Sequence, residues 1–168
     1  MATTNDNLHE AFAGESQANR SYTVFAEQAE KDGLPGVAKL FRAVAAAEAI
    51  HAAAHLKAVG GVKKTAENLA HAMAGEKHEF TEMYPPMVAT AEADGNKRAA
   101  RSMRYAMEVE KVHFELYSAA LAKVQAGSDL GGDIVVKICP TCGHTVIGDA
   151  PDECPVCNAS AASYIEIA

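Results

Sequence analysis

Two short stretches of the chain share the pattern Ala-x-Ala-Gly-Glu, at residues 11–15 and 72–76. Each is followed further along the chain by a Glu-x-x-His motif, at residues 48–51 and 110–113. Residues three apart lie on one face of a helix, so each motif presents a carboxylate and an imidazole side by side. Mixed oxygen and imidazole ligands suit iron or manganese, and helical bundles hold pairs of these ions with this combination of residues.

The spacing of these motifs indicates an internal repeat. Glu15 precedes Glu48 by 33 residues, and Glu76 precedes Glu110 by 34. The sequence AEKDG at residues 29–33 likewise aligns with AEADG further on. The second copy contains one extra residue, in the region of Pro85 and Pro86, as a bulge in a helix would require. We therefore expect one helical hairpin written twice, with pseudo-two-fold symmetry.

The repeat brings four carboxylates and two imidazoles into one predicted core. Buried carboxylates must be paired or must bind metal, and two divalent ions would neutralise four of them. A single Glu-x-x-His on a helix is a weak signal, but two of them in matched positions are specific. The predicted ligands are Glu15, Glu48, His51, Glu76, Glu110 and His113.

Glu79 breaks the repeat, because its partner position in the first copy is Ala18. It lies three residues after Glu76 and therefore faces the same site. A fifth carboxylate suits a site that cycles between diferrous and diferric states; the alternative is a surface residue at the edge of the helix. Tyr22 and Tyr84 match across the repeat and are predicted to donate hydrogen bonds to ligand carboxylates, although amphipathic packing also explains them.

All four cysteines lie near the C-terminal end, as two Cys-x-x-Cys pairs separated by eleven residues. Two such pairs predict a tetrahedral site of four thiolates, which holds zinc or a single iron. The spacing does not choose between these metals. Iron makes more sense beside a redox-capable dinuclear site, since it passes one electron at a time. The ligands are Cys139, Cys142, Cys154 and Cys157.

The periodicity of apolar residues predicts a mainly α fold. We expect four helices, over residues 5–32, 35–60, 65–95 and 96–126, that form a four-helix bundle over residues 1–126. Residues 127–133 read as a linker. Residues 134–168 contain two β-type runs around the cysteines and are too few to fold without a metal.

Composition restricts the partners and the location. The formal net charge is -7 and no basic stripe is visible, which argues against a nucleic-acid surface. No signal peptide and no apolar run of membrane-spanning length is recognisable. We therefore predict a cytoplasmic protein that interacts with neither nucleic acid nor membrane.

Over essentially its whole length the sequence resembles the rubrerythrin family. The resemblance rests on AFAGES, on AGEKHEFTEMYP, on the two Glu-x-x-His motifs and on the CPTCG and CPVC pairs. It implies a ferritin-like di-iron domain joined to a rubredoxin-like domain with one iron. Two departures are His144, where an aromatic residue commonly follows Cys-x-x-Cys-Gly, and a short spacing between Cys142 and Cys154.

The resemblance also implies an activity, the reduction of hydrogen peroxide to water in defence against oxidative stress. Electrons would enter from an upstream reductase at the rubredoxin-type iron. Glu48 and Glu110 would bridge the two irons, and one iron would exchange His51 for Glu79 on oxidation. Glu79, His51, Tyr22 and Tyr84 are therefore the predicted catalytic residues.

The connection between the second and third helices is short for a ferritin-like bundle, in which these helices run parallel. Residues 60–64 span at most ~18 Å when extended, whereas the second helix is ~37 Å long. We therefore predict a domain-swapped homodimer, with an up-down-up-down bundle as the competing topology. Two other functions compete with the peroxidase: a ferroxidase or iron-handling protein of the ferritin type, and a scaffold with a zinc ribbon.

Overall fold

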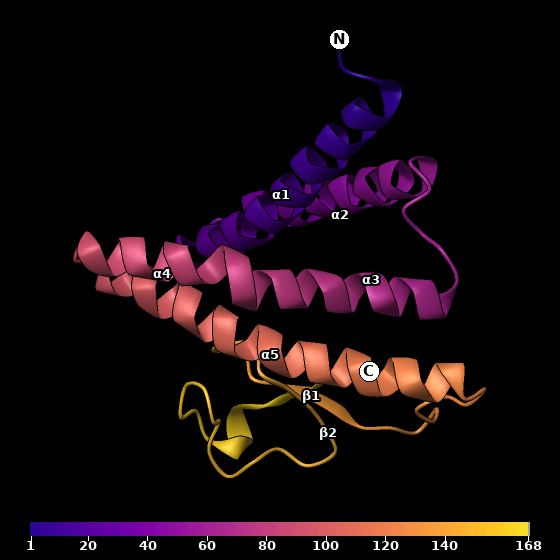
Figure 1. Ribbon diagram of the computed structural model, residues 1–168. Helices are drawn as coiled ribbons and strands as arrows, with labels where there is room; N and C mark the ends of the chain where they lie inside the picture. Colours follow the sequence, from indigo (N-terminus) through magenta and orange to yellow (C-terminus); the bar gives the residue numbers. More distant parts are fainter. Residues whose placement is uncertain (168) are drawn as a thin grey trace. The chain divides into compact units, whose positions relative to one another are not determined.

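The computed structural model describes residues 1–167 and has the helices that the periodicity predicts. They are α1 (Thr4–Lys31), α2 (Pro35–Ala58), α3 (Thr65–His78), the π-helix η1 (Glu79–Met83), α4 (Tyr84–Ala93) and α5 (Lys97–Gln125). The chain divides into two compact units, Met1–Lys63 and the part that begins at Lys64. In Figure 1, α1 lies along α2, and α3 and α4 lie along α5. Each unit therefore contains one hairpin of the predicted repeat.

The first unit begins with a capped helix. The Thr3 side chain accepts a hydrogen bond from the backbone N–H of Asp6, and the Asp6 carboxylate accepts one from the backbone N–H of Thr3. This capping box satisfies amides that the first helical turn leaves free. The chain turns at Gly33, whose φ of 74° suits glycine, and Pro35 occupies the first turn of α2.

Small side chains hold α1 and α2 together. The described side chains that are buried in this unit all belong to alanines: Ala26, Ala29, Ala38, Ala45 and Ala52. Asn19 reaches across from α1 and donates a hydrogen bond of 2.7 Å to the backbone oxygen of Ala45. Several large apolar side chains stay exposed, among them Leu40 at 63% and Ile50 at 70%. The hairpin is closely packed but has no large apolar core of its own.

The second unit contains the bulge that the repeat requires. The π-helix Glu79–Met83 interrupts the α-helix, and Pro85 and Pro86 follow it in the first turn of α4. The extra residue thus lies just before the prolines and not at them. A prolyl residue lacks an N–H, so the preceding turn must rearrange its hydrogen bonds, and a π-turn does so.

Matched ion pairs show the same symmetry. Arg42 contacts Glu30 between α2 and α1, with 2.5 Å between Nη2 and Oε1. Arg104 contacts Glu92 between α5 and α4 through the same two atom types. In both hairpins the glutamate precedes the arginine by 12 residues, and the exposed pairs contribute little to stability. Their value is as markers of two equivalent hairpins.

A small sheet lies beside the loops that contain the cysteines. Strands β1 (Val136–Ile138), β2 (Thr145–Ile147) and β3 (Ile165–Ile167) pair in the antiparallel order β2-β1-β3, and a short 3-10 helix (Ala161–Ser163) precedes β3. Residue 136 pairs with 147 on one side and with 167 on the other. The sequence predicts the runs that form β1 and β3. It does not predict β2, whose three residues follow a turn directly and show no alternation of their own.

The sheet belongs to the same compact unit as α3, α4 and α5, and β2 contacts α5. The division at residues 127–133, which the sequence predicts from composition, stays a prediction. No helix among residues 1–167 is both long and apolar enough to cross a membrane.

Candidate metal centres

The first unit brings three predicted ligands together. Glu15 projects from α1, and Glu48 and His51 project from α2 one turn apart; their ligand atoms lie within 4.8 Å of one another. Nδ1 of His51 is 2.8 Å from Oε2 of Glu48 and 3.8 Å from Oε1 of Glu15. Two carboxylates and one imidazole converge here, which is a ligand set for one divalent ion.

The second unit repeats this arrangement. Glu76 from α3 meets Glu110 and His113 from α5, again with their ligand atoms within 4.8 Å. Nδ1 of His113 lies 2.7 Å from Oε2 of Glu110. Burial and the neighbouring charge of Glu110 raise the pKa of Glu76 above its usual range. Two carboxylates this close repel each other unless a cation lies between them.

The asymmetric residue Glu79 lies in the same environment. It begins η1, and burial followed by the charge of Glu76 raises its pKa. Tyr84 begins α4, and its pKa is raised by burial and by the charges of Glu79, Glu110 and Glu76. Both side chains therefore lie near enough to these carboxylates for their charges to shift the pKa values, although Glu79 is not among the three residues whose ligand atoms converge.

Tyr22 has a different environment from Tyr84. Its ring packs against Phe25 and Phe41, with 6.2 Å between ring centroids in each pair. Phe25 and Phe41 also contact each other edge to face at 5.7 Å. The structure therefore places Tyr22 in an aromatic cluster of the first hairpin, which is the packing arrangement that its amphipathic position allows.

The four cysteines converge at the β sheet. Their sulfur atoms lie within 4.8 Å of one another. The Sγ atoms of Cys139 and Cys157 are 3.5 Å apart, and those of Cys142 and Cys154 are also 3.5 Å apart. A tetrahedral metal with bonds of about 2.3 Å to sulfur separates its sulfurs by ~3.8 Å. The arrangement is therefore already close to that of a metal-bound site.

The two residues His144 and Tyr164 support the cysteines. Nδ1 of His144 lies 2.9 Å from the Tyr164 hydroxyl, and His144 is buried. Burial opposes the thiolate of Cys154, but hydrogen bonds from Tyr164 and from backbone amides outweigh it and lower the pKa of Cys154 to about 6. The sequence does not predict this role of Tyr164, because no motif links a tyrosine at this position to the cysteines.

The β sheet also touches a predicted metal ligand. Nε2 of His113 lies 3.1 Å from Oγ1 of Thr145, the first residue of β2. Thr145 was not predicted either. It lies three residues after Cys142 but 32 residues from His113, and nothing in the sequence pattern indicates that contact.

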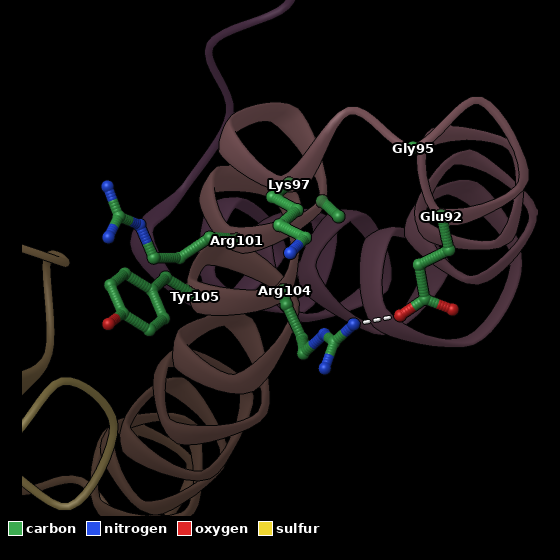
Figure 2. A pocket seen from close by; sticks show the side chains of 7 residues that line it. Glu92, Gly95, Lys97, Arg101, Arg104 and Tyr105 are labelled. Carbon is green, nitrogen blue, oxygen red and sulfur yellow. Dashed lines mark hydrogen bonds and ion pairs between the residues drawn. The ribbon is translucent and has the colours of Figure 1, made fainter.

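A separate hollow of about 440 Å³ lies where α4 turns into α5. Figure 2 shows Arg104 turned toward Glu92, while Arg101 and Tyr105 point the other way. Glu92 and Arg104 belong to the ion pair described above, and no residue of the hollow belongs to the ligand groups. The hollow is thus distinct from the candidate metal centres.

Among the described residues, the donors form three separate groups, one in each hairpin and one at the cysteines. Each hairpin offers two carboxylates, which balance one divalent ion, and the imidazoles suit iron. The four thiolates fit a separate tetrahedral ion. These features define a class of proteins, the di-iron carboxylate helical proteins of ferritin-like fold, here with a rubredoxin-like module added.

Comparison with known proteins identifies the family. The model of the Rubrerythrin family matches residues 6–121, and that of the rubrerythrin rubredoxin-like domain matches residues 138–164. The chain belongs to the rubrerythrin family. This confirms the family and the fold class that the motifs predict.

Relatives cover nearly the whole chain. Rubrerythrin-2 of Clostridium acetobutylicum is 35% identical over 94% of this chain and 92% of its own length. Rubrerythrin of Porphyromonas gingivalis is 37% identical over 92% of this chain and 84% of its own length. Nigerythrin of Nitratidesulfovibrio vulgaris is 33% identical over 94% of this chain and 83% of its own length. The structure of fully reduced, all-ferrous nigerythrin matches with a TM-score of 0.56 and 31% identity, covering 99% of this chain and 88% of that one.

Family membership and the donor groups confirm the predicted cofactors at the level of site types. The chain carries the Glu/His groups of a di-iron site and a rubredoxin-like four-cysteine site. It is an oxidoreductase by family.

Proposed function

We propose that this protein is a peroxidase that reduces hydrogen peroxide to water, with electrons delivered through the four-cysteine site from an upstream reductase. The observation that carries the proposal is the second unit. It combines a Glu-Glu-His group, the additional carboxylate of Glu79 and a four-cysteine site that packs against the same helix, α5. An iron-storage protein has no need of the last feature.

Six of the residues that would hold the dinuclear metals form the two Glu-Glu-His groups, and Glu79 is added because it lies one turn after Glu76. The dinuclear ligands are Glu15, Glu48, His51, Glu76, Glu79, Glu110 and His113, and the mononuclear ligands are the four cysteines. Bound iron would supply two electrons to the oxygen–oxygen bond of peroxide and accept replacements one at a time through the cysteine site. Glu48 and Glu110, each on the second helix of its hairpin, would be the carboxylates shared between the two irons.

Glu79 and His51 would be alternative ligands of one ion in this proposal. His51 is more exposed than its counterpart, with 54% of its side chain accessible against 27% for His113. Glu79 lies at the start of a π-turn, where backbone hydrogen bonds are already rearranged, so a small shift reorients its carboxylate. An added carboxylate stabilises the more positive, oxidised site, which favours Glu79 over a neutral imidazole there.

Tyr84 donates a hydrogen bond toward the ligand carboxylates in this proposal. A tyrosine hydroxyl is protonated at physiological pH, and burial and the nearby carboxylates raise the pKa of Tyr84 further, so it remains a donor. Tyr22 is the matched residue of the first hairpin. Its packing against Phe25 and Phe41 supports a smaller role, namely fixing the position of α1 relative to α2.

A complete dinuclear site requires both hairpins, and we propose that they come from two chains. The residues 59–64 between α2 and α3 reach about 20 Å at most, whereas the 24 residues of α2 span ~36 Å. A ferritin-like arrangement needs these helices parallel, which so short a connection does not allow within one chain. Exposed apolar residues such as Leu40 and Ile50 provide the surface that the partner's second hairpin would cover.

Rapid mixing of the reduced protein with peroxide tests this function. The diferric spectrum is expected to form much faster with peroxide than with dioxygen, and the four-cysteine iron to oxidise afterwards. A faster reaction with dioxygen would instead favour the ferroxidase alternative. Zinc in the cysteine site and fewer than two irons per chain would favour a scaffold.

A further inference from the structure

Thr145 connects the rubredoxin-like sheet to a ligand of the dinuclear group. Its Oγ1 donates a hydrogen bond of 3.0 Å to the backbone oxygen of Gly143, which follows Cys142 directly. The same Oγ1 lies 3.1 Å from Nε2 of His113. A carbonyl oxygen only accepts, so the threonine hydrogen is committed to Gly143. In the contact with His113, Oγ1 must therefore accept.

This assignment fixes the imidazole of His113. If Nε2 carries the proton that Thr145 accepts, the neutral ring leaves the lone pair of Nδ1 free. Nδ1 is the atom that lies 2.7 Å from Glu110, within the ligand group. The hydrogen bond thus selects the tautomer that binds metal and holds the ring with the correct nitrogen inward.

The contact lies in a packed part of the second unit. Val109, one turn before His113, is only 2% exposed, and a Cβ on Gly143 would lie 3.8 Å from its Cγ1. A small hollow between α5 and β2 is lined by His113, Leu116, Tyr117 and Thr145. The sheet therefore rests on α5 beside this ring, which limits how far the ring can move.

The first hairpin offers its histidine a different environment. Within the described residues of that unit, His51 makes its contacts through Nδ1, to Glu48 and Glu15. Thr145 and His113 belong to the same compact unit, so this support for the imidazole is built into the second hairpin.

We propose that Thr145 is a positioning residue for His113, through which the rubredoxin-like module holds that imidazole in its metal-binding orientation. The inference rests on the dinuclear site of the proposed function but not on its substrate. Its test therefore measures metal retention and not peroxide turnover.

The test compares Thr145→Val, which keeps the shape but removes the hydroxyl, with Thr145→Ser, which restores it. Thr90→Val is the matched control, because Thr90 also donates to a backbone oxygen, that of Pro86, on α4. Each protein is loaded with iron, and the transfer of dinuclear iron to a chelator is timed. Loss of a hydrogen-bond partner behind a ligand typically costs about 10- to 100-fold in metal affinity.

We expect Thr145→Val to release dinuclear iron about 10- to 100-fold faster, with Thr145→Ser and Thr90→Val close to wild type. The visible spectrum of the cysteine iron checks that the sheet is folded, and Thr145→Ala replaces the valine variant if it is not. Release of iron from Thr145→Val at the wild-type rate overturns the inference. Release from Thr145→Ser that is as fast as from Thr145→Val also overturns it, because the serine restores the hydroxyl. If the wild-type protein does not hold two dinuclear irons before the chelator is added, the proposed function itself is wrong. This result is distinct from a failure of the inference about Thr145.

Discussion

Glu79 lies one helical turn after Glu76, at the residue where α3 gives way to a π-helix. Burial and the charge of Glu76 raise the pKa of Glu79, so both carboxylates share one environment. In the first hairpin the matching residue is Ala18, in an uninterrupted α-helix. The two copies of the repeat therefore differ at this position both in backbone conformation and in side chain.

Glu79→Ala is expected to keep two irons per chain and to slow the oxidation of the reduced protein by peroxide about 10- to 100-fold. The reason is that the oxidised site loses the carboxylate that would replace His51. Stopped-flow absorbance measures the rate. Glu82→Ala is the control, because Glu82 belongs to the same π-turn but is 72% exposed and contacts His78. Equal rates in both variants would refute the proposed exchange.

Tyr84→Phe should leave the metal content unchanged and reduce the peroxide rate about tenfold, since it removes a donor near three carboxylates. Because its pKa is raised, the Tyr84 hydroxyl stays protonated below the usual tyrosine pKa of about 10, and its contribution should not decline there. Tyr105→Phe, in the hollow between α4 and α5, is the comparison. A similar small effect in both would assign Tyr84 to packing.

Mixed dimers separate the swapped arrangement from the unswapped one. One chain carries Glu15→Ala and Glu48→Ala, which disable its first hairpin, and the other carries Glu76→Ala and Glu110→Ala, which disable its second. In a swapped heterodimer the two intact hairpins meet and form one working site. In an unswapped heterodimer both sites are defective.

The readout is dinuclear iron per purified heterodimer, separated by two different affinity tags. The swap predicts about half of the wild-type dinuclear iron, because one of two sites is complete. The reciprocal control places all four substitutions on one chain with a wild-type partner, and the swap then predicts no complete site. Iron in the reciprocal dimer and none in the first would show that each chain builds its own site.

Cys157→Ser should remove the mononuclear iron while the dinuclear iron is retained. A thiolate is lost from a four-sulfur site, but the Glu and His groups are unaffected. Peroxide should still oxidise the reduced protein once, whereas re-reduction by an electron donor should slow strongly. Repeated-mixing experiments measure both steps. Re-reduction at the wild-type rate would mean that electrons reach the dinuclear site without the cysteine module.

The sequence by itself determined which ligand pairs share one face of a helix, and it showed that this pattern occurs twice. Helical spacing places Glu48 with His51 and Glu110 with His113, because side chains three residues apart share a face whatever the rest of the fold does. The unequal spacing from Glu15 and Glu76 required an extra residue, and the structure has it as a π-turn. Local geometry of this kind depends on the chain alone.

Only the tertiary structure decided the contacts between distant segments. The β-type run at β2 is limited to Thr145–Ile147, whereas those at β1 and β3 extend beyond the strands, so the pairing of β2 with β1 had no sequence signal. The contact of Thr145 with His113 and that of Tyr164 with the cysteines depend on how the sheet rests on α5 and closes on itself. Such contacts are fixed by packing between elements, which residue types and spacing along the chain do not specify.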